Sequence, residues 1–253
     1  MSRYRLTIAY CGESFDGWQS QPTGNAVQDH LLRALQEVQP GITTVQGSGR
    51  TDAGVHAFAQ VAHFDEAEKT RMNGRAWREA LNNRLPETLR IMEAEVAPPD
   101  FHARYSAKGK TYRYEIFQGP VLPPWRARRA WHLRRQLDID RLHEAIACFE
   151  GRHNFSAFAA NRGDPASEPK DPHRTIFQAR ATIEGEEIRL EFTGDGFLYK
   201  MVRMITGAVI RAGESALAIE DIQEWLAAPT PCRKSPLTAP AEGLYLVRVH
   251  YGD

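Results

Sequence analysis

A carboxylate, Asp52, lies in a glycine-rich stretch at residues 47–56, and a guanidinium, Arg50, precedes it by two positions. Three glycines within eight residues let the backbone take positive φ values and approach a ligand closely. Flanking β-branched and alternating residues predict strands at 42–45 and 59–64, and charged loops between strands are places where proteins put chemistry. The alternative is a tight turn in which Asp52 caps backbone N–H groups beside a solvated Arg50.

Known cofactor motifs do not match this loop. A dinucleotide fingerprint needs glycine where Asp52 stands, and a P-loop needs a Gly-Lys-Ser/Thr sequence that does not follow. The chain has no H-E-x-x-H and no paired C-x-x-C, and its nine histidines lack metal-ligand spacing. A lone histidine such as His56 or His102 is expected to be a structural hydrogen-bonding residue. We therefore expect chemistry that requires neither a cofactor nor a metal ion.

The composition is typical of a folded, soluble protein. Of 253 residues, 42% are apolar and 25% are charged, and 32 Lys and Arg balance 32 Asp and Glu. A nucleic-acid surface on such a chain must come from local segregation of charge. Residues 125–135 are a candidate, because five arginines and two tryptophans occur there without an acid, although a solvated basic face has the same pattern.

The sequence also indicates where the protein is found. No apolar run approaches the ~20 residues that cross a bilayer, and the N-terminus lacks the apolar core of a signal peptide. The three cysteines, Cys11, Cys148 and Cys232, are scattered, which favours reduced thiols over a disulfide framework. We expect a cytoplasmic protein without a membrane segment.

Hydrophobic periodicity predicts the elements that must position the Asp52 loop. Apolar residues recur at helical spacing at 27–38, 76–81, 142–149, 201–209 and 222–226. Further strands are predicted at 3–10, 89–96, 111–117, 176–183, 188–192 and 244–249. Pro98-Pro99 marks the boundary between an N-terminal half, 1–100, and a C-terminal half, 101–253, each of α+β type. Residues 161–172 are expected to form a mobile surface loop.

The string at residues 49–56 resembles the signature of the tRNA pseudouridine synthase A family. Tyr105 stands where phenylalanine is frequent in that family, and residues 197–200 vary. Further matches follow in the family's order over essentially the whole chain: Gly17-Trp18-Gln19, Leu85-Pro86, residues 100–107, Tyr112-Arg113-Tyr114, and residues 197–203 and 242–246.

This resemblance implies a pseudouridine synthase fold, in which two similar α+β halves carry a joined, mostly antiparallel sheet flanked by helices, with the active cleft between them. It implies isomerisation of uridine to pseudouridine in the anticodon stem-loop of tRNA, at positions 38–40. Asp52 matches the family's nucleophile, and Arg203 matches the arginine that pairs with it. Tyr112 matches a tyrosine that can stack on the extruded uracil, while Tyr114 lies on the same strand face by alternation.

The resemblance also implies the partners. tRNA is the expected substrate, held by the catalytic body itself, and a homodimer that carries one tRNA across both subunits is expected. Arg50 is expected to contact RNA and to help hold the displaced backbone. Within residues 125–135, called the basic segment below, the expected substrate-binding residues are Arg126, Arg128 and Arg129.

Two other functions stay open at this point. One is a non-catalytic tRNA-binding or folding module that has kept this scaffold. The other is a hydrolase that uses Asp52 as a general base and releases free uracil. Whether Asp52 would attack uracil C6 or ribose C1′ is open as well.

Overall fold

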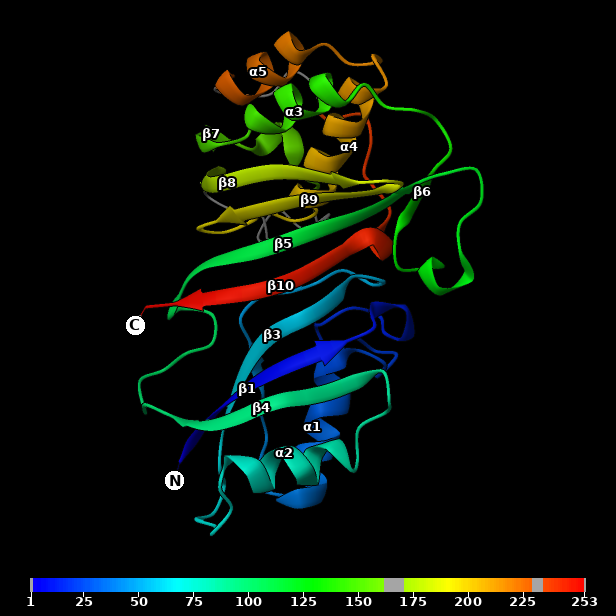
Figure 1. Cartoon of the computed structure of the whole chain (residues 1–253). Helices are drawn as coiled ribbons and strands as arrows, with labels where there is room; N and C mark the ends of the chain where they lie inside the picture. The colour runs from blue at the N-terminus through cyan, green and yellow to red at the C-terminus, as the bar shows by residue number, and fades with distance from the viewer. Residues whose placement is uncertain (1, 162–170, 229–233, 253) are drawn as a thin grey trace. The chain divides into compact units, whose positions relative to one another are not determined.

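The computed structural model describes residues 2–161, 171–228 and 234–252 (Figure 1). Within them, ten strands and five α-helices form an α+β architecture, which confirms the expected fold class. The chain divides into two compact units: unit 1 is Met1–Lys108 with Tyr245–Asp253, and unit 2 is Gly109–Leu244. Most of the loop expected at 161–172 lies outside the described residues, as does Cys232.

Unit 1 is built on β1 (Arg3–Tyr10), which pairs antiparallel with β3 (His56–Asp65) on one side and β4 (Leu89–Ala97) on the other. The short β2 (Gln46–Gly47) pairs antiparallel with β3, and β10 (Leu244–Tyr251) pairs parallel with it. Alternate residues of β1 are buried, as the period of a strand with one covered face requires.

Two helices complete the core of unit 1. α1 (Val27–Val38) buries Leu31 and Leu35, and α2 (Gly74–Asn82) buries Trp77. The Tyr4 ring on β1 lies 5.5 Å from Phe64 on β3 and 5.8 Å from Trp77, so α2 packs its aromatic side chain onto the sheet. Figure 1 shows α2 beside β4 at the edge of this unit.

Unit 2 carries the strand order β5-β9-β8-β7. The strands are β5 (Ala107–Gln118), β9 (Glu187–Gly194), β8 (His173–Glu184) and β7 (Gly151–Asn154), all antiparallel to their neighbours, and β6 (Trp131–Leu133) pairs parallel with β5. The helices α3 (Ile139–Ala147), α4 (Met201–Gly213) and α5 (Ile219–Ala227) gather on one side of this sheet (Figure 1).

The two faces of unit 2's sheet differ in chemistry. Along β9, Ile188, Leu190 and Phe192 are fully buried at 0% exposure. The alternate residues Arg189 and Glu191 carry charge and form ion pairs with residues of β5 and β8. One face is therefore the apolar core, and the other is a charged face.

The strand predicted at 42–45 is wrong. Ile42 and Val45 are buried, as the pattern required, but their carbonyl groups accept hydrogen bonds from α1 side chains. Gln36 Nε2 donates to Ile42 O at 3.1 Å, and Gln28 Nε2 donates to Val45 O at 2.9 Å. The two glutamine side chains supply the hydrogen bonds that a neighbouring strand would otherwise give to these carbonyl groups, so strand pairing begins only at Gln46.

The compact units also differ from the halves expected at 1–100 and 101–253. Unit 1 extends to Lys108 and includes Tyr245–Asp253 from the end of the chain. β10 belongs there because it pairs with β3 at Tyr245 and Leu246. A boundary drawn from the prolines in the sequence cannot show such a return of the chain.

Candidate active site

The Asp52 loop connects β2 to β3 and is fixed at its start by β3 itself. Ser48 N donates to Val61 O at 2.7 Å, and Ser48 Oγ donates to Gln60 Oε1 at 2.7 Å. Gln60 Nε2 in turn donates to Gly49 O at 3.1 Å. Because Ser48 and Gln60 are both fully buried, these bonds are shielded from water and hold the approach to Asp52 rigidly.

Thr51, directly before Asp52, is anchored to β1 and to the turn after it. The Tyr10 hydroxyl lies 2.8 Å from Thr51 Oγ1, and Trp18 N donates to Thr51 O at 3.1 Å. Burial raises the pKa of Tyr10 to about 12, so the phenol stays protonated and able to donate. Asp52 itself is half-buried, and its carbonyl accepts from Val55 N at 3.1 Å. The loop therefore holds Asp52, a partly accessible residue, on a fixed backbone.

Sequence reasoning missed the residues that support this loop from the side. A Cβ on Gly47 would lie 2.4 Å from Cε2 of the Trp18 indole, so only glycine lets the ring pack there. Gly17 has a φ of 95°, and a Cβ there would lie 2.7 Å from Thr51 O. The Gly17-Trp18 string was a visible signal, but its contact with Thr51 follows from tertiary structure alone.

His56 is a structural residue of unit 1. It is 2% exposed, and its Nδ1 accepts from Gly12 N at 3.1 Å. Its ring stacks on Tyr245 of β10 at 4.6 Å, and Tyr245 stacks in turn on Phe58 at 5.0 Å. This agrees with the hydrogen-bonding role expected for a lone histidine.

The two tyrosines of β5 have different environments. Tyr114 is fully buried, and its hydroxyl donates to Pro240 O at 2.6 Å, so its polar atom is satisfied inside unit 2. Tyr112 is 8% exposed, and its ring makes an edge contact with Phe197 at 5.1 Å and 78°. The environment of Tyr114 is that of a core residue, which leaves Tyr112 as the candidate for chemistry on this strand.

Arg203 lies on the first turn of α4 and is tied to the segment that precedes β10. Its Nε donates to Ala239 O at 2.8 Å, and Ala239 N donates back to the Arg203 carbonyl at 3.0 Å. The neighbouring Pro240 carbonyl is the one that Tyr114 holds. α4, β5 and residues 239–240 thus form one hydrogen-bonded group that fixes the guanidinium of Arg203.

The predicted RNA-binding arginines fall into two classes. Arg126 is half-buried and pairs with Glu115 at 3.2 Å and also with Glu187, so its charge is neutralised within unit 2. Arg128 and Arg129 are exposed, and the neighbouring Trp125 is 75% exposed. The ion pairs of Arg126 anchor the segment that presents these exposed groups.

The structure places the expected site residues in both units. Asp52 and Arg50, which is exposed, belong to unit 1. Tyr112, Arg203 and the basic segment belong to unit 2. The pairing of Asp52 with Arg203 stays a prediction.

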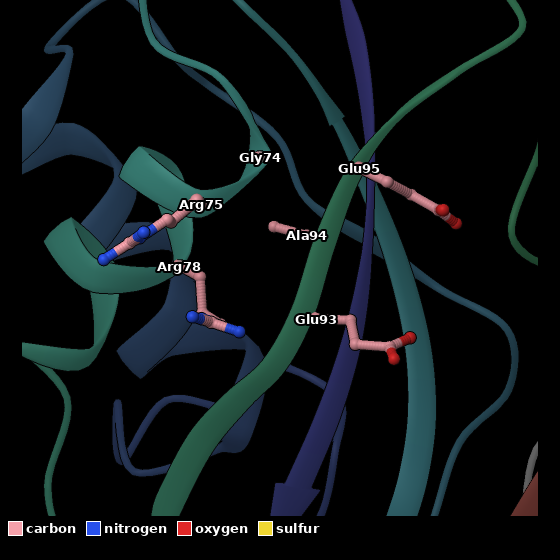
Figure 2. A pocket seen from close by; sticks show the side chains of 6 residues that line it. All are labelled: Gly74, Arg75, Arg78, Glu93, Ala94 and Glu95. Carbon is pink, nitrogen blue, oxygen red and sulfur yellow. The ribbon is translucent and has the colours of Figure 1, made fainter.

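A surface pocket of about 300 Å³ lies between α2 and β4, and none of the predicted site residues lines it; its lining residues are Gly74, Arg75, Arg78, Glu93, Ala94 and Glu95. Figure 2 shows that the charged side chains do not converge, because Glu93 and Glu95 point away from α2. Arg75 pairs instead with Glu79 at 2.8 Å. We assign this pocket no chemical role.

The described parts of the chain contain neither a metal-binding cluster nor a membrane-spanning helix. No group of three or more His, Cys, Asp or Glu side chains there could hold a metal ion. None of the helices in those parts is both long and apolar enough to span a membrane.

Known proteins resemble this chain along its full length. A family model described as tRNA pseudouridine synthase matches residues 6–106 and 145–252, which include Asp52 and Arg203; Tyr112 lies between the two matched segments. The tRNA pseudouridine synthase A of Akkermansia muciniphila is 48% identical over 255 residues, which cover 100% of this chain and 96% of the relative. The tRNA pseudouridine synthase A of Methylacidiphilum infernorum is 38% identical over 98% of this chain and 95% of its own. These matches confirm the resemblance seen in the sequence, and the chain therefore belongs to the tRNA pseudouridine synthase family, an isomerase family.

Proposed function

We propose that this protein isomerises uridine to pseudouridine in the anticodon stem-loop of tRNA, at positions 38–40, with Asp52 as the nucleophile. Family membership supports the reaction and the class of RNA. The observation that carries the assignment of Asp52 is its position on a loop whose flanking residues are held by buried hydrogen bonds, while Asp52 itself is only half-buried. A nucleophile needs this combination of a fixed backbone and an accessible side chain.

The reaction breaks the C1′–N1 bond of the uridine and forms a C1′–C5 bond. The proton on C5 leaves and N1 takes one up, so substrate and product contain the same atoms and no oxidant or group donor is consumed. The protein must therefore supply a nucleophile and retain the detached base while it rotates. Asp52 is assigned the first task, and attack at uracil C6 or at ribose C1′ both fit that assignment.

The remaining roles follow from the family resemblance and from the local contacts. We assign Tyr112 to stacking on the extruded uracil, because base–aromatic stacking offsets part of the few kcal/mol that base flipping requires. We assign Arg203 to keeping Asp52 ionised, since a guanidinium lowers the pKa of a nearby carboxyl. Arg50, Arg128 and Arg129 are assigned to the RNA backbone. A cytoplasmic homodimer that holds one tRNA across both subunits completes the proposal.

The test is pseudouridine formation on an unmodified tRNA transcript, followed by mapping of the modified positions. The Asp52→Asn variant should lose turnover by at least about 10³-fold while it still binds tRNA, since removing a nucleophile has effects of this size or larger. Asp16→Asn is a matched control, because Asp16 is also a loop aspartate of unit 1 and its Oδ2 accepts from Thr23 Oγ1 at 2.6 Å, a bond that an amide oxygen can keep.

Each result has a separate meaning. Full turnover by Asp52→Asn would refute the assigned nucleophile. Binding of tRNA without any product from the wild-type protein would instead indicate a non-catalytic binding module. Release of free uracil would indicate a hydrolase. Modification outside positions 38–40 would overturn the assigned sites and leave the reaction in place.

A further inference from the structure

The turn at residues 101–106, which the proposed chemistry does not use, presents an aromatic ring to solvent. Tyr105 is 75% exposed, although the backbone of its turn is held by hydrogen bonds from other elements. Arg104 is exposed beside it, with its guanidinium carbon 5.6 Å from the centre of the Tyr105 ring. Within the described residues, this guanidinium has no carboxylate partner. Proteins that bind single-stranded nucleic acids commonly stack a base on an exposed aromatic ring and place a cation beside it for the phosphate backbone.

Three strands hold the backbone of this turn in place. Arg3 Nη1 on β1 donates to Phe101 O at 2.7 Å, and Tyr251 Oη on β10 donates to Ala103 O at 2.7 Å. Ala103 N donates to the Nδ1 atom of His63 on β3 at 3.2 Å. The turn is thus rigid before any ligand arrives, so little conformational entropy is lost on binding.

His102 fixes the orientation of Tyr105. Its Nδ1 accepts from Arg104 N at 3.1 Å and from Tyr105 N at 3.3 Å, so Nε2 carries the proton and donates to Gln46 Oε1 at 3.0 Å. The imidazole centroid lies 4.3 Å from the Tyr105 ring and 4.7 Å from His63. The ring planes of His63 and His102 are tilted by 60° and those of His102 and Tyr105 by 35°, so the three rings are in contact from the buried His63 to the exposed Tyr105 without stacking face to face. The exposed Tyr105 ring is the surface on which a further flat ring would stack.

The local charge indicates what that further ring belongs to. Within unit 1, residues 101–108 carry two exposed cations, Arg104 and Lys108, and no Asp or Glu, although the overall charge of the chain balances at 32 and 32. Segregation of this kind favours a polyanion.

We propose that the turn at residues 101–106 is an RNA-binding subsite, where one unpaired base of the substrate tRNA stacks on Tyr105 and Arg104 contacts the adjoining phosphate. The subsite rests on the proposed function for its substrate, and it adds a recognition element outside the Asp52 loop. It contributes to binding in the ground state and in the transition state alike.

The experiment compares tRNA binding and turnover of the full-length protein and its variants, with an unmodified tRNA transcript as the probe. Tyr105→Ala should raise Kd and KM on the order of 10-fold with kcat nearly unchanged, as expected for loss of one stacked base in uniform binding. Tyr105→Trp should retain wild-type affinity. Arg104→Gln should reduce the slope of log K against log salt by about 0.7 to 0.9, which corresponds to one phosphate.

A matched control is Phe177→Ala, which removes another exposed aromatic ring, 58% exposed, on β8 of unit 2. The subsite would be overturned if Phe177→Ala and Tyr105→Ala lost equal affinity for tRNA. It would also be overturned if Tyr105→Ala kept the wild-type Kd and KM. A shift of the tRNA-free protein's oligomeric state in Tyr105→Ala would show that a second copy occupies the ring, and would overturn it too. The proposed function fails separately, if the wild-type protein forms no pseudouridine at all.

Discussion

Gly207 lies in the middle of α4. For Gly207→Ala, helix propensity and tertiary structure predict opposite changes in the free energy of unfolding. In an isolated helix, alanine in place of glycine would stabilise by roughly 1 kcal/mol. In the structure, a Cβ at Gly207 would lie 2.1 Å from Leu237 O and 2.8 Å from Leu237 C. The distance to Leu237 O is roughly 1 Å shorter than the 3.4 Å at which ordinary van der Waals contact begins. Both of these Leu237 atoms belong to the backbone.

The magnitude follows from what must move. Overpacking of a well-packed site costs about 1–3 kcal/mol, and backbone cannot relax by a simple rotamer change. Residue 237 also leads into Ala239, which exchanges two hydrogen bonds with Arg203, each worth about 1 kcal/mol net. After subtraction of the gain in propensity, we expect Gly207→Ala to destabilise by about 2 kcal/mol, or about 4–8 °C in Tm for a chain of this size.

Equilibrium unfolding in urea, together with single-turnover pseudouridine formation, tests this expectation. Gly213→Ala in the same helix is the control, because a Cβ there would meet Asp138 O and Leu137 at 3.5 Å, which is ordinary contact. That variant should be as stable as the wild type or slightly more stable. If Gly207→Ala is equally stable, the Leu237 carbonyl does not pack against α4 as described and the reasoning is refuted. Reduced turnover with the stability loss would show that the segment positions Arg203.

Three further predictions concern buried polar groups. Tyr114→Phe removes the hydroxyl that donates to Pro240 O at 2.6 Å and should destabilise by about 1–3 kcal/mol in urea unfolding, because the buried carbonyl loses its partner. Arg126→Ala should cost about 2 kcal/mol in the same assay, because Glu115, only 6% exposed, loses a counter-charge. Burial lowers the pKa of His63 to about 4, so the unfolding free energy should fall as pH drops from about 6.5 to 4, and His63→Gln should flatten that part of the curve.

The sign of the pH effect follows from proton binding. The unfolded chain binds a proton at His63 near pH 6.5, whereas the folded protein binds it only near pH 4. Between these values the unfolded state holds more protons, so acid favours unfolding. A pH curve for His63→Gln that overlays the wild type would contradict this account.

Controls separate structural from RNA-binding effects. Arg128→Asn removes an exposed charge at a position with a φ of 57°, which asparagine tolerates, so stability should stay within about 0.5 kcal/mol while tRNA affinity falls. Stability loss in Arg128→Asn equal to that in Arg126→Ala would show that the two arginines do not differ as described. Unchanged stability in Tyr114→Phe would mean that water replaces its hydroxyl.

Periodicity was sufficient for most of the fold. The apolar spacing predicted α1 and α4, and alternation predicted β1 and the β8–β9 hairpin, because those patterns report which face of an element is covered. The short β6 and β7 were missed, since three or four residues carry too little pattern. The strand predicted at 42–45 failed because two glutamines of α1, distant in sequence, take the carbonyl groups.

For the candidate site, the sequence by itself determined the Asp52 loop, the candidate Tyr112 and the family, since these depend on residue types in a fixed local order. Only the tertiary structure decided that Trp18 and Tyr10 hold the residue before Asp52, and that Tyr114 is a core residue. It also decided that Arg126 is neutralised by carboxylates while Arg128 is exposed. The physical reason is that hydrogen bonds and ion pairs form between atoms that the fold brings together from distant positions, and a pattern of neighbours along the chain contains no record of them.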